Sequence, residues 1–435
     1  MSEGEMKYII IGNSAAGIGC VEGIRQIDKK GSITVISDEP HQSYSRPLIS
    51  YLVQGKVTAE KMMYRRDSFY EDNAVKLLNG VRAIEINPGR KTVTLSDGKT
   101  LPYDRLLVAT GSRAFEPPIE GIDSVDCKIF FMTLNDAKKL ENLLAPEKRI
   151  LIVGAGLIGL KCAEGIMSGD AGKRVHEITV VDLAPRVLAS ILDSDGAALV
   201  QNCFEKKGVK FMLSKSIRRF EPKVRGQSGY LAVLEDAGAN GTGPAIDFDI
   251  VVLAAGVRPN TELLSGIAEV GRGIVINEKS ETSRPFIYAA GDCTESIDAS
   301  SGEQKIMALL PNAYMQGECA GVNMAGGEKS FDKAIPMNAI GFMGLHIITA
   351  GNYTGEVYES SGEGTYKKLF YSGNRLNGYI FIGNIEKAGI YTSLIRDRTP
   401  LDSIDFALIC ERPGLMAFTK EVRAEKLGGR VWKTK

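Results

Sequence analysis

The stretch KYIIIGNSAAGIGCVEGI, residues 7–24, runs from an apolar segment through a glycine-rich turn into a run of small residues. A second stretch, RILIVGAGLIGLKCAEGI at 149–166, repeats this pattern. Each copy continues to another apolar segment with an acidic end, SITVISDE at 32–39 and EITVVD at 177–182. An apolar strand, a tight glycine turn, a helix and a second strand form a βαβ unit. The chain is therefore predicted to be an α/β protein with two doubly wound parallel sheets.

Further segments complete this organisation. Two apolar runs that end in small residues, LPYDRLLVATG at 101–111 and FDIVVLAAGVRPN at 248–260, predict one more buried strand for each sheet. Alternating stretches near KTVTLSDGKTL at 91–101 and GYLAVLED at 229–236 predict antiparallel meanders that cover a sheet face. The pattern changes after about residue 333.

In this last part of the chain, YKKLFY at 366–371 and LNGYIFIGN at 376–384 are joined by SGNR and predict a β-hairpin. EKAGIYTSLIRDR at 386–398 predicts a helix. We therefore expect a small α+β domain at the C-terminus.

Composition narrows the range of functions. The 435 residues include 53 basic and 53 acidic ones, so the formal net charge is zero and gives no sign of a nucleic-acid or anionic-membrane binder. No apolar run is long enough for a membrane span, and we expect a cytoplasmic protein. Seven scattered cysteines without a C-x-x-C pair predict free thiols. His41, His176 and His346 lie far apart in the sequence, and we predict no metal site.

The second glycine turn has the spacing of a dinucleotide-binding loop. Gly154, Gly156 and Gly159 allow a tight turn, a close approach to the pyrophosphate and close helix packing. Asp182, at the end of the next strand, is placed to accept hydrogen bonds from the adenosine ribose. Its carboxylate would repel a 2′-phosphate, and Arg186 lies too far past the strand end to clamp one. NADH is therefore preferred to NADPH.

The first glycine turn is less regular. Gly12 and Gly17 are in place, while Ser14 stands at the middle glycine position and could donate its hydroxyl to a phosphate. Asp38 or Glu39 could hold the ribose, and spacing does not choose between them. Either turn alone could be a strand–turn–helix without a nucleotide. Two such turns in one chain favour two dinucleotides, a flavin and a nicotinamide, which react by contact.

Three further motifs point to a family. FIYAAGDC at 286–293, ATG at 109–111 and PNAYMQG at 311–317 resemble motifs of the flavoproteins with two dinucleotide-binding domains, the pyridine nucleotide-disulfide oxidoreductase superfamily. The resemblance spans nearly the whole chain. It implies that Asp292 binds the ribityl hydroxyls of FAD and that the helix begun by Pro311 directs its positive end at the flavin ring. A buried structural aspartate and a proline-initiated helix are the alternatives.

SYSRPLIS at 43–50 narrows the resemblance to NADH:rubredoxin reductases and the related NADH-dependent ferredoxin or nitrite reductase flavoproteins. In these relatives a basic residue at the position of Arg46 contacts the flavin cofactor. Relatives with cysteine-based turnover carry a redox cysteine in this region, but this chain has none between Cys20 and Cys127. Relatives usually have glutamate where this chain has Lys161. An ammonium that faced the flavin would favour its reduced form, whereas a lysine that extends to solvent would not.

The resemblance implies an FAD-binding domain at residues 1–113 and 255–332, an NAD-binding domain at 114–254 and an α+β domain at 333–435. The FAD-binding residues expected are Gly12, Ser14, Ala15, Ala16, Gly17, Asp38, Glu39, Arg46, Pro47, Val81, Ala109, Thr110, Gly111, Gly291, Asp292, Pro311, Asn312 and Ala313. The NAD-binding residues expected are Gly154, Gly156, Leu157, Ile158, Gly159, Asp182, Ala255 and Gly256.

The function implied is hydride transfer from NADH to FAD, followed by electron transfer to a small redox protein such as rubredoxin or ferredoxin. Two alternatives stay open. One is an NADH oxidase or a reductase of a small disulfide or quinone, and the other is a flavin-binding sensor that turns over no substrate. No acid–base residue is needed for hydride transfer, so Lys161 is the one candidate for tuning the reaction. By analogy with relatives, the C-terminal domain could also form a homodimer.

Overall fold

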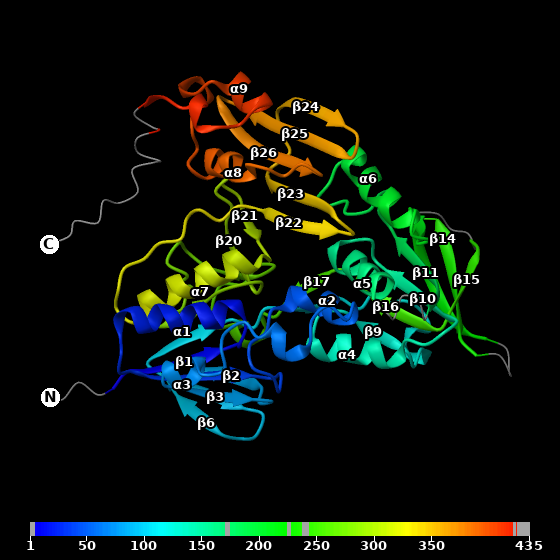
Figure 1. Ribbon diagram of the computed structural model, residues 1–435. Coiled ribbons are helices and arrows are strands. Elements are labelled where there is room, and N and C mark those ends of the chain that lie inside the picture. Colours follow the sequence, from blue (N-terminus) through cyan, green and yellow to red (C-terminus); the bar gives the residue numbers. More distant parts are fainter. Residues whose placement is uncertain (1–4, 170–174, 224–227, 237–242, 421–422, 424–435) are drawn as a thin grey trace. The chain divides into compact units, whose positions relative to one another are not determined.

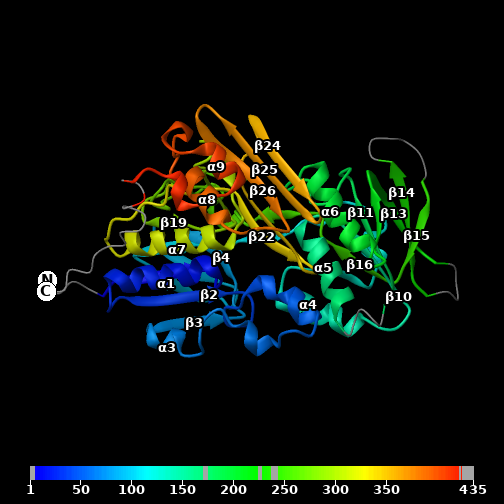
Figure 2. The same ribbon diagram turned by 45° about the horizontal axis from the view of Figure 1, so that its top comes forward.

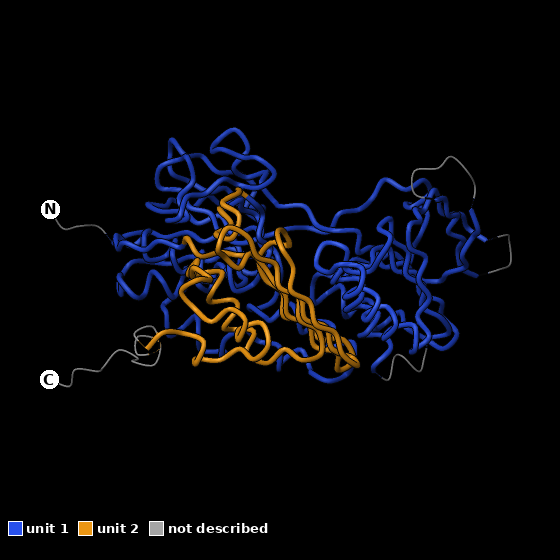
Figure 3. Tube along the Cα trace, turned by 90° about the horizontal axis from the view of Figure 1, so that it is seen from above, with its two compact units in different colours: residues 1–296, 305–331 blue, residues 297–304, 332–435 orange. Residues whose placement is uncertain are grey.

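The computed structural model describes residues 5–169, 175–223, 228–236, 243–420 and 423. The chain divides into two compact units, which Figure 3 shows in different colours. The first unit contains residues 1–296 and 305–331, and the second contains residues 297–304 and 332–435. The last residues of the expected C-terminal domain, 424–435, lie outside the described part of the chain. Both of the predicted parallel sheets belong to the first unit.

The first βαβ unit lies at the centre of a five-stranded parallel sheet (Figure 1), as predicted. Its strand order is β19-β7-β1-β2-β3, and all four neighbouring pairs are parallel. The strands are β1 (Lys7–Ile11), β2 (Ser32–Ser37), β3 (Val75–Asn79), β7 (Arg105–Val108) and β19 (Ile287–Ala289). The edge strand β19 comes from beyond the second βαβ unit, so this half of the unit is discontinuous in sequence.

Both faces of this sheet are covered. Successive side chains of a strand point to opposite faces, and in β1 Ile10 packs in one core cluster while Ile9 and Ile11 pack in another. The helices on the first face are α1 (Ala15–Ile27) and α7 (Leu310–Met324). The predicted meander on the second face is β4 (Ala83–Asn87), β5 (Thr92–Leu95) and β6 (Thr100–Pro102).

Helices α1 and α7 run side by side in both Figure 1 and Figure 2. Glycines allow this close approach. A Cβ atom on Gly317 of α7 would lie 2.0 Å from the carbonyl oxygen of Ala16, and one on Gly19 of α1 would lie 2.4 Å from that of Tyr314. No side chain fits in these spaces, so the contact keeps the N-terminal ends of the two helices close together.

The second βαβ unit builds a second five-stranded parallel sheet, with the order β12-β11-β10-β16-β9. Its strands are β9 (Lys128–Phe130), β10 (Lys148–Val153), β11 (Val175–Asp182), β12 (Lys210–Leu213) and β16 (Ile250–Leu253). The helices of this half are α4 (Leu134–Leu143), α5 (Leu157–Ser168) and α6 (Ser194–Glu205). Strand β16 is the strand predicted within 248–260.

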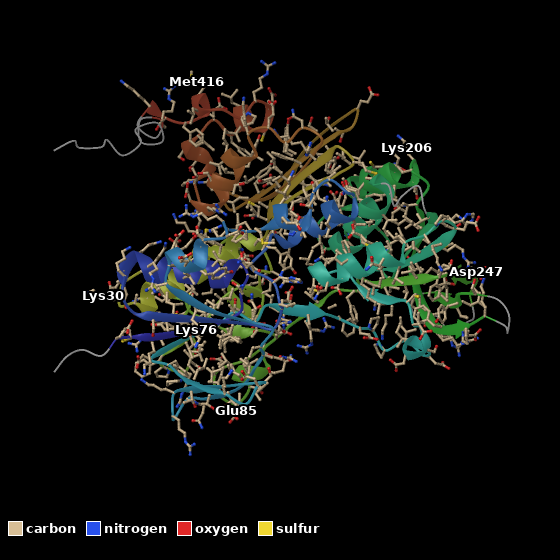
Figure 4. All side chains as sticks on the ribbon, turned by 60° about the horizontal axis from the view of Figure 1, so that its bottom comes forward. Lys30, Lys76, Glu85, Lys206, Asp247 and Met416 are labelled. Carbon is tan, nitrogen blue, oxygen red and sulfur yellow. The ribbon has the colours of Figure 1, made fainter. Side chains whose placement is uncertain are left out.

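A three-stranded antiparallel sheet adjoins this half, as predicted from GYLAVLED. It consists of β13 (Lys215–Pro222), β14 (Tyr230–Asp236) and β15 (Ala245–Phe248). Arg149, at the start of β10, donates to Asp247 of β15 at 2.7 Å and to Asp249 at 3.0 Å, and Asp247 is labelled in Figure 4. The pair with Asp247 joins the parallel sheet to the antiparallel one, and the pair with Asp249 links β10 to the residue just before β16.

Short elements connect the two halves of the first unit. Strand β8 (Ser112–Ala114) leads out of the first half and pairs with β17 (Val257–Pro259), which leads back. The remaining helices are α2 (Ile49–Val53) and α3 (Phe69–Asp72). Strand β18 (Ile274–Val275) pairs with β20 (Thr294–Ile297), after which the chain passes through the second unit and returns at β21 (Gln304–Ile306).

The second unit is an antiparallel sheet with helices, which confirms the predicted α+β character. Its order is β22-β23-β26-β25-β24. The strands are β22 (Met337–Phe342), β23 (Leu345–Gly351), β24 (Glu356–Gly362), β25 (Thr365–Ser372) and β26 (Arg375–Ile382), followed by α8 (Ala388–Arg396) and α9 (Phe406–Glu411). Strands β25 and β26 are the predicted hairpin. Among the helices that the structure describes, none has the length and apolar character needed to cross a bilayer.

Candidate active site

The first glycine turn is tightly packed between β1 and α1. Gly12 has a φ of +117°, and a Cβ atom there would lie 2.1 Å from the carbonyl oxygen of Ala109. A Cβ atom on Gly17 would lie 2.0 Å from the carbonyl oxygen of Gly12. Ser14 is the N-cap of α1, but its hydroxyl makes no capping hydrogen bond. The turn therefore presents backbone amides and an available hydroxyl at the positive end of a helix.

A cavity of about 380 Å³ opens beside this turn. Most of the expected FAD-binding residues line it: Gly12, Ser14, Ala15, Ala16, Asp38, Glu39, Arg46, Val81, Ala109, Thr110, Gly111, Gly291, Asp292 and Ala313. These residues come from both ends of the discontinuous half and from the connection between the two halves. Leu310 and Ala313 bring the N-terminus of α7 to the same cavity, close to that of α1.

Four expected residues do not line the cavity, namely Gly17, Pro47, Pro311 and Asn312. Gly17 instead packs against the backbone of Gly12, and Asn312 is buried within α7. Pro47 and Pro311 each occupy the first turn of a helix, where the missing amide hydrogen costs nothing.

The two acidic residues after β2 differ in their surroundings, although both line the cavity. Asp38 is exposed. Glu39 accepts a hydrogen bond from the Tyr44 hydroxyl at 2.7 Å and forms an ion pair with Arg46. The hydroxyl of Tyr44 in turn accepts from the backbone amide of Leu134 in α4. The Glu39 carboxylate is thus held in one orientation, and Arg46 has an acidic partner within the protein.

Asp292 lines the same cavity as these groups. Burial raises the pKa of its carboxyl, and the positive charge of Arg46 opposes that rise. The preceding residue, Gly291, has a φ of +84° and donates its backbone amide to the Gln316 side chain at 2.9 Å. Gln316 in α7 therefore fixes the loop that carries Asp292. Gln316 lies within the PNAYMQG motif, but its role was not expected from the sequence, because that role depends on contact between segments.

Sequence reasoning missed other residues of the cavity wall. They include Asn13, His41, Tyr44 and Asn260. Asn260 donates to the carbonyl oxygen of Thr110 at 2.9 Å and accepts from its hydroxyl through its own carbonyl at 2.6 Å, so it joins the two connecting segments. Three of these residues lie in stretches that the sequence analysis quoted, Asn13 in the first glycine turn, Tyr44 in SYSRPLIS and Asn260 at the end of FDIVVLAAGVRPN, whereas His41 does not.

The second glycine turn repeats the geometry of the first. Gly154 has a φ of +115°, and a Cβ atom there would lie 2.2 Å from the carbonyl oxygen of Ala254. Gly159 packs against the carbonyl oxygen of Gly154, as Gly17 does against that of Gly12. Gly156 is the N-cap of α5 and faces open space. Leu157 and Ile158 form the first turn of that helix, and Ala255 and Gly256 follow the neighbouring strand β16.

Asp182 is the last residue of β11, and a hydrogen bond connects its side chain to the second glycine turn. Its carboxylate accepts from the backbone amide of Ala155 at 2.6 Å and from that of Ala184 at 2.7 Å. Each carboxylate oxygen can accept a further hydrogen bond. Arg186 donates to the carbonyl oxygens of Leu192 and Ala189, so this guanidinium is held within its own loop and away from a role as a phosphate clamp.

Lys161 lies on α5, two residues past Gly159. Most of its side chain is covered, and its ammonium contacts Glu164 in the same helix and the ring of Tyr51 in α2. The Lys161 side chain therefore does not extend into solvent, which was one of the two orientations expected from the sequence. Lys161 instead lies where α5 contacts α2, that is, at the contact between the two halves of the first unit.

No cysteine is found among the described residues that line the cavity. All seven cysteines are free, and five of them are buried. Within the described part of the chain, no group of histidine, cysteine and acidic side chains is placed to hold a metal ion.

Comparison with known proteins agrees with this geometry. A family model described as pyridine nucleotide-disulphide oxidoreductase matches residues 6–317, which contain both glycine turns. The chain belongs to the pyridine nucleotide-disulphide oxidoreductase family. It is therefore an oxidoreductase, and the two dinucleotides of this family member are FAD and NADH. The two halves of the first unit, each built on a parallel sheet, have the two dinucleotide-binding folds of the family.

Several relatives have been named. The chain is 32% identical to the NADH-dependent phenylglyoxylate dehydrogenase subunit epsilon of Aromatoleum evansii over 91% of this chain and 92% of that protein. It is 30% identical to the rubredoxin-NAD(+) reductase of Pseudomonas putida over 74% and 80%. The match to the nitrite reductase [NAD(P)H] of Bacillus subtilis, also 30%, covers 90% of this chain and 47% of that enzyme. Among solved structures, a covalent putidaredoxin reductase–putidaredoxin complex matches with a TM-score of 0.84 and 26% identity over 94% of this chain and 96% of that chain.

The residues of the cavity suit a flavin dinucleotide, independently of the likeness to relatives. Gly12 admits no side chain, and two helix N-termini supply partial positive charge. The Nδ2 atom of Asn13 is buried and has no hydrogen-bond partner in the described part of the chain. A ligand with acceptor oxygens would supply the missing hydrogen-bond partner of this buried donor.

Proposed function

We propose that this family member takes a hydride from NADH onto FAD and delivers the electrons to a small redox protein of the rubredoxin or ferredoxin type. The proposal rests on the observation that two glycine turns of matching geometry lie in one compact unit, while no cysteine lines the described cavity wall. Relatives named for rubredoxin and putidaredoxin support the choice of acceptor. The free cysteines suit the cytoplasm.

The FAD site proposed is the set of expected residues that line the cavity. FAD, when bound, supplies the redox chemistry, because it accepts two electrons together and releases them singly. The turn at Gly12–Gly17 and the N-termini of α1 and α7 hold the pyrophosphate and the electron-rich ring. Glu39 is the better ribose ligand than Asp38, because Tyr44 and Arg46 hold its carboxylate in place. Asp292 accepts from the ribityl hydroxyls.

The NADH site proposed is the second turn with Asp182, Ala255 and Gly256. Asp182 keeps acceptor positions for the ribose hydroxyls after its two backbone hydrogen bonds. We assign residues 114–254 to this site and residues 1–113 and 255–332 to the FAD site. Lys161 tunes the reaction, since a largely covered ammonium at the contact between the halves favours added electrons.

A second candidate is an NADH oxidase that uses oxygen as the acceptor. It is favoured by a 34% identical relative over 75% of this chain and 71% of that protein, the NADH oxidase of Methanocaldococcus jannaschii. It would have to react without a thiolate, because the described cavity wall contains none.

Anaerobic titration tests the proposal. The purified holoprotein is expected to be yellow and to lose its visible flavin absorbance with one equivalent of NADH. Rubredoxin or ferredoxin should then restore the absorbance much faster than air-saturated buffer does. Faster recovery with air would favour the oxidase, and a flavin that NADH fails to bleach would overturn both enzyme assignments in favour of the sensor.

A further inference from the structure

Asn13 carries a hydrogen-bond donor that the protein itself leaves unused. It stands between Gly12 and the N-cap Ser14 and lines the 380 Å³ cavity. Its Nδ2 atom is buried and has no partner among the described residues. Buried donors in folded proteins are nearly always paired, so an unpaired one needs an explanation.

The orientation of the Asn13 amide follows from its neighbours. The backbone amide of Ser43 donates to the Tyr70 hydroxyl at 3.2 Å, and that hydroxyl lies 2.8 Å from the Oδ1 atom of Asn13. A backbone N–H can only donate, so the Tyr70 oxygen is the acceptor in the first contact. The single hydroxyl hydrogen of Tyr70 is then used toward Asn13, which must present its oxygen.

The network therefore fixes which end of the amide is left over. A flipped Asn13 would place its amide hydrogens against the Tyr70 hydroxyl, which already accepts from Ser43 and would lose the acceptor for its own hydrogen. Burial raises the pKa of Tyr70, so its hydroxyl keeps its hydrogen at neutral pH. The Nδ2 hydrogens are directed away from Tyr70, and nothing in the described chain receives them.

We infer that Tyr70 orients Asn13 so that its Nδ2 donates a hydrogen bond to an acceptor oxygen of the bound flavin dinucleotide. Asn13 is then a binding residue, and Tyr70, which reaches the ligand only through Asn13, is a positioning residue. This inference rests on the proposed FAD site. It adds a side-chain contact to a turn whose other contributions come from its backbone and from Ser14.

The test measures FAD binding by apoprotein rather than turnover. Asn13→Ala is expected to raise the dissociation constant for FAD about tenfold, the usual loss for a hydrogen bond to a charged or strongly polar acceptor. Asn13→Asp keeps the shape but replaces the donor by an acceptor, and should weaken binding more than Asn13→Ala does. Equal or tighter binding by Asn13→Asp would mean that the ligand presents a donor there, and would overturn the inference.

Tyr70→Phe tests the relay. It keeps the ring but frees the amide to turn, so binding should weaken about threefold, and the double variant Asn13→Ala, Tyr70→Phe should bind no worse than Asn13→Ala alone. Additive losses would contradict a positioning role for Tyr70.

Tyr8→Phe is the matched control. It removes a tyrosine hydroxyl from the same core cluster, but that hydroxyl donates to Asp28, away from the cavity. Thermal unfolding of each apoprotein checks that the variants are folded. If wild-type apoprotein binds no FAD, the proposed function fails. If wild type binds FAD and Asn13→Ala binds it equally well, the inference alone fails.

Discussion

The Nζ atom of Lys161 lies 2.7 Å from a carboxylate oxygen of Glu164, and the exposed fractions of the two side chains are only 18% and 8%. Both residues belong to α5, and the same ammonium lies 5.6 Å from the centre of the Tyr51 ring in α2. The pair places a cation and its counterion where α5 of the second half contacts α2 of the first half. Lys161 and Glu164 are three residues apart in α5, so the cation and its counterion lie one turn from each other on the same helix.

Replacing Lys161 by glutamine should make the flavin harder to reduce, because a positive charge that stabilises added electrons is lost. We expect the midpoint potential to fall by about 30 mV, which for a two-electron couple is roughly 1.4 kcal/mol. A redox titration of the holoprotein against a reference dye measures the shift. Lys56→Gln is the matched control, since Lys56 also lies 5.6 Å from the Tyr51 ring but is exposed. Equal shifts in both variants would show that Lys161 has no special position.

Asp182→Asn should weaken the use of NADH more than that of NADPH. The amide keeps one acceptor oxygen for the backbone at Ala155 or Ala184 but loses the charge and an acceptor for the ribose. We expect kcat/KM for NADH to fall about tenfold and that for NADPH to stay constant or rise, since repulsion of a 2′-phosphate is removed. Steady-state kinetics with both nucleotides measures the change. A parallel loss with both would indicate a role in folding of the loop alone.

Gly12→Ala should abolish FAD retention. The new Cβ atom would require a φ of +117° and would lie 2.1 Å from the carbonyl oxygen of Ala109, so the turn must move. Gly98→Ala provides the comparison, because Gly98 has a φ of +83° but open space around it. We expect Gly98→Ala to lower the free energy of unfolding by about 1 kcal/mol and to retain FAD. Flavin content per protein, measured by absorbance, separates the two; FAD retained by Gly12→Ala would refute the close-packed turn.

Asp292 should make the apoprotein less stable as the pH rises. Burial raises the pKa of this carboxyl in the folded state, against the opposing charge of Arg46, so the folded chain holds this proton to a higher pH than the unfolded chain does. The stability it contributes is fully present below the unfolded pKa of about 3.9 and is lost as the pH rises through the folded pKa.

Asp292→Asn removes this titration. Urea unfolding of both apoproteins from about pH 4 to 7 should give a variant whose free energy of unfolding gains on that of wild type as the pH rises. The comparison within one background cancels the other carboxyls. A difference that shrinks with pH would mean that the charge of Arg46 outweighs burial.

The repeated glycine turns could be predicted because their chemistry is local. A strand, a turn with a positive φ and a helix occupy consecutive residues, so Gly12 and Gly154 are recognisable without a partner segment. The same holds for the meanders and for the hairpin β25–β26, whose patterns alternate over short distances.

The cavity wall depended on contacts that spacing does not encode. Arg46 was expected to contact the flavin cofactor, and it does line the cavity, but its ion pair with Glu39 could not be read from spacing. Gln316 holds the loop before Asp292 from a different helix. The segment 297–304 belongs to the second unit, although its sequence carries no sign of this. Such contacts can be identified only once the fold is known, because each joins residues that are distant in the chain.

The contact of Gly19 with Tyr314 and of Ala16 with Gly317 has a consequence for biosynthesis. During translation α1 leaves the ribosome long before α7 exists, so this face of the first sheet is covered by α1 alone while the second half of the unit is made. The second half, which is continuous in sequence, is then free to fold first, and capture of FAD at the proposed site is expected to wait for α7. Truncation before residue 310 should therefore leave a nascent chain that depends on chaperones and carries no flavin.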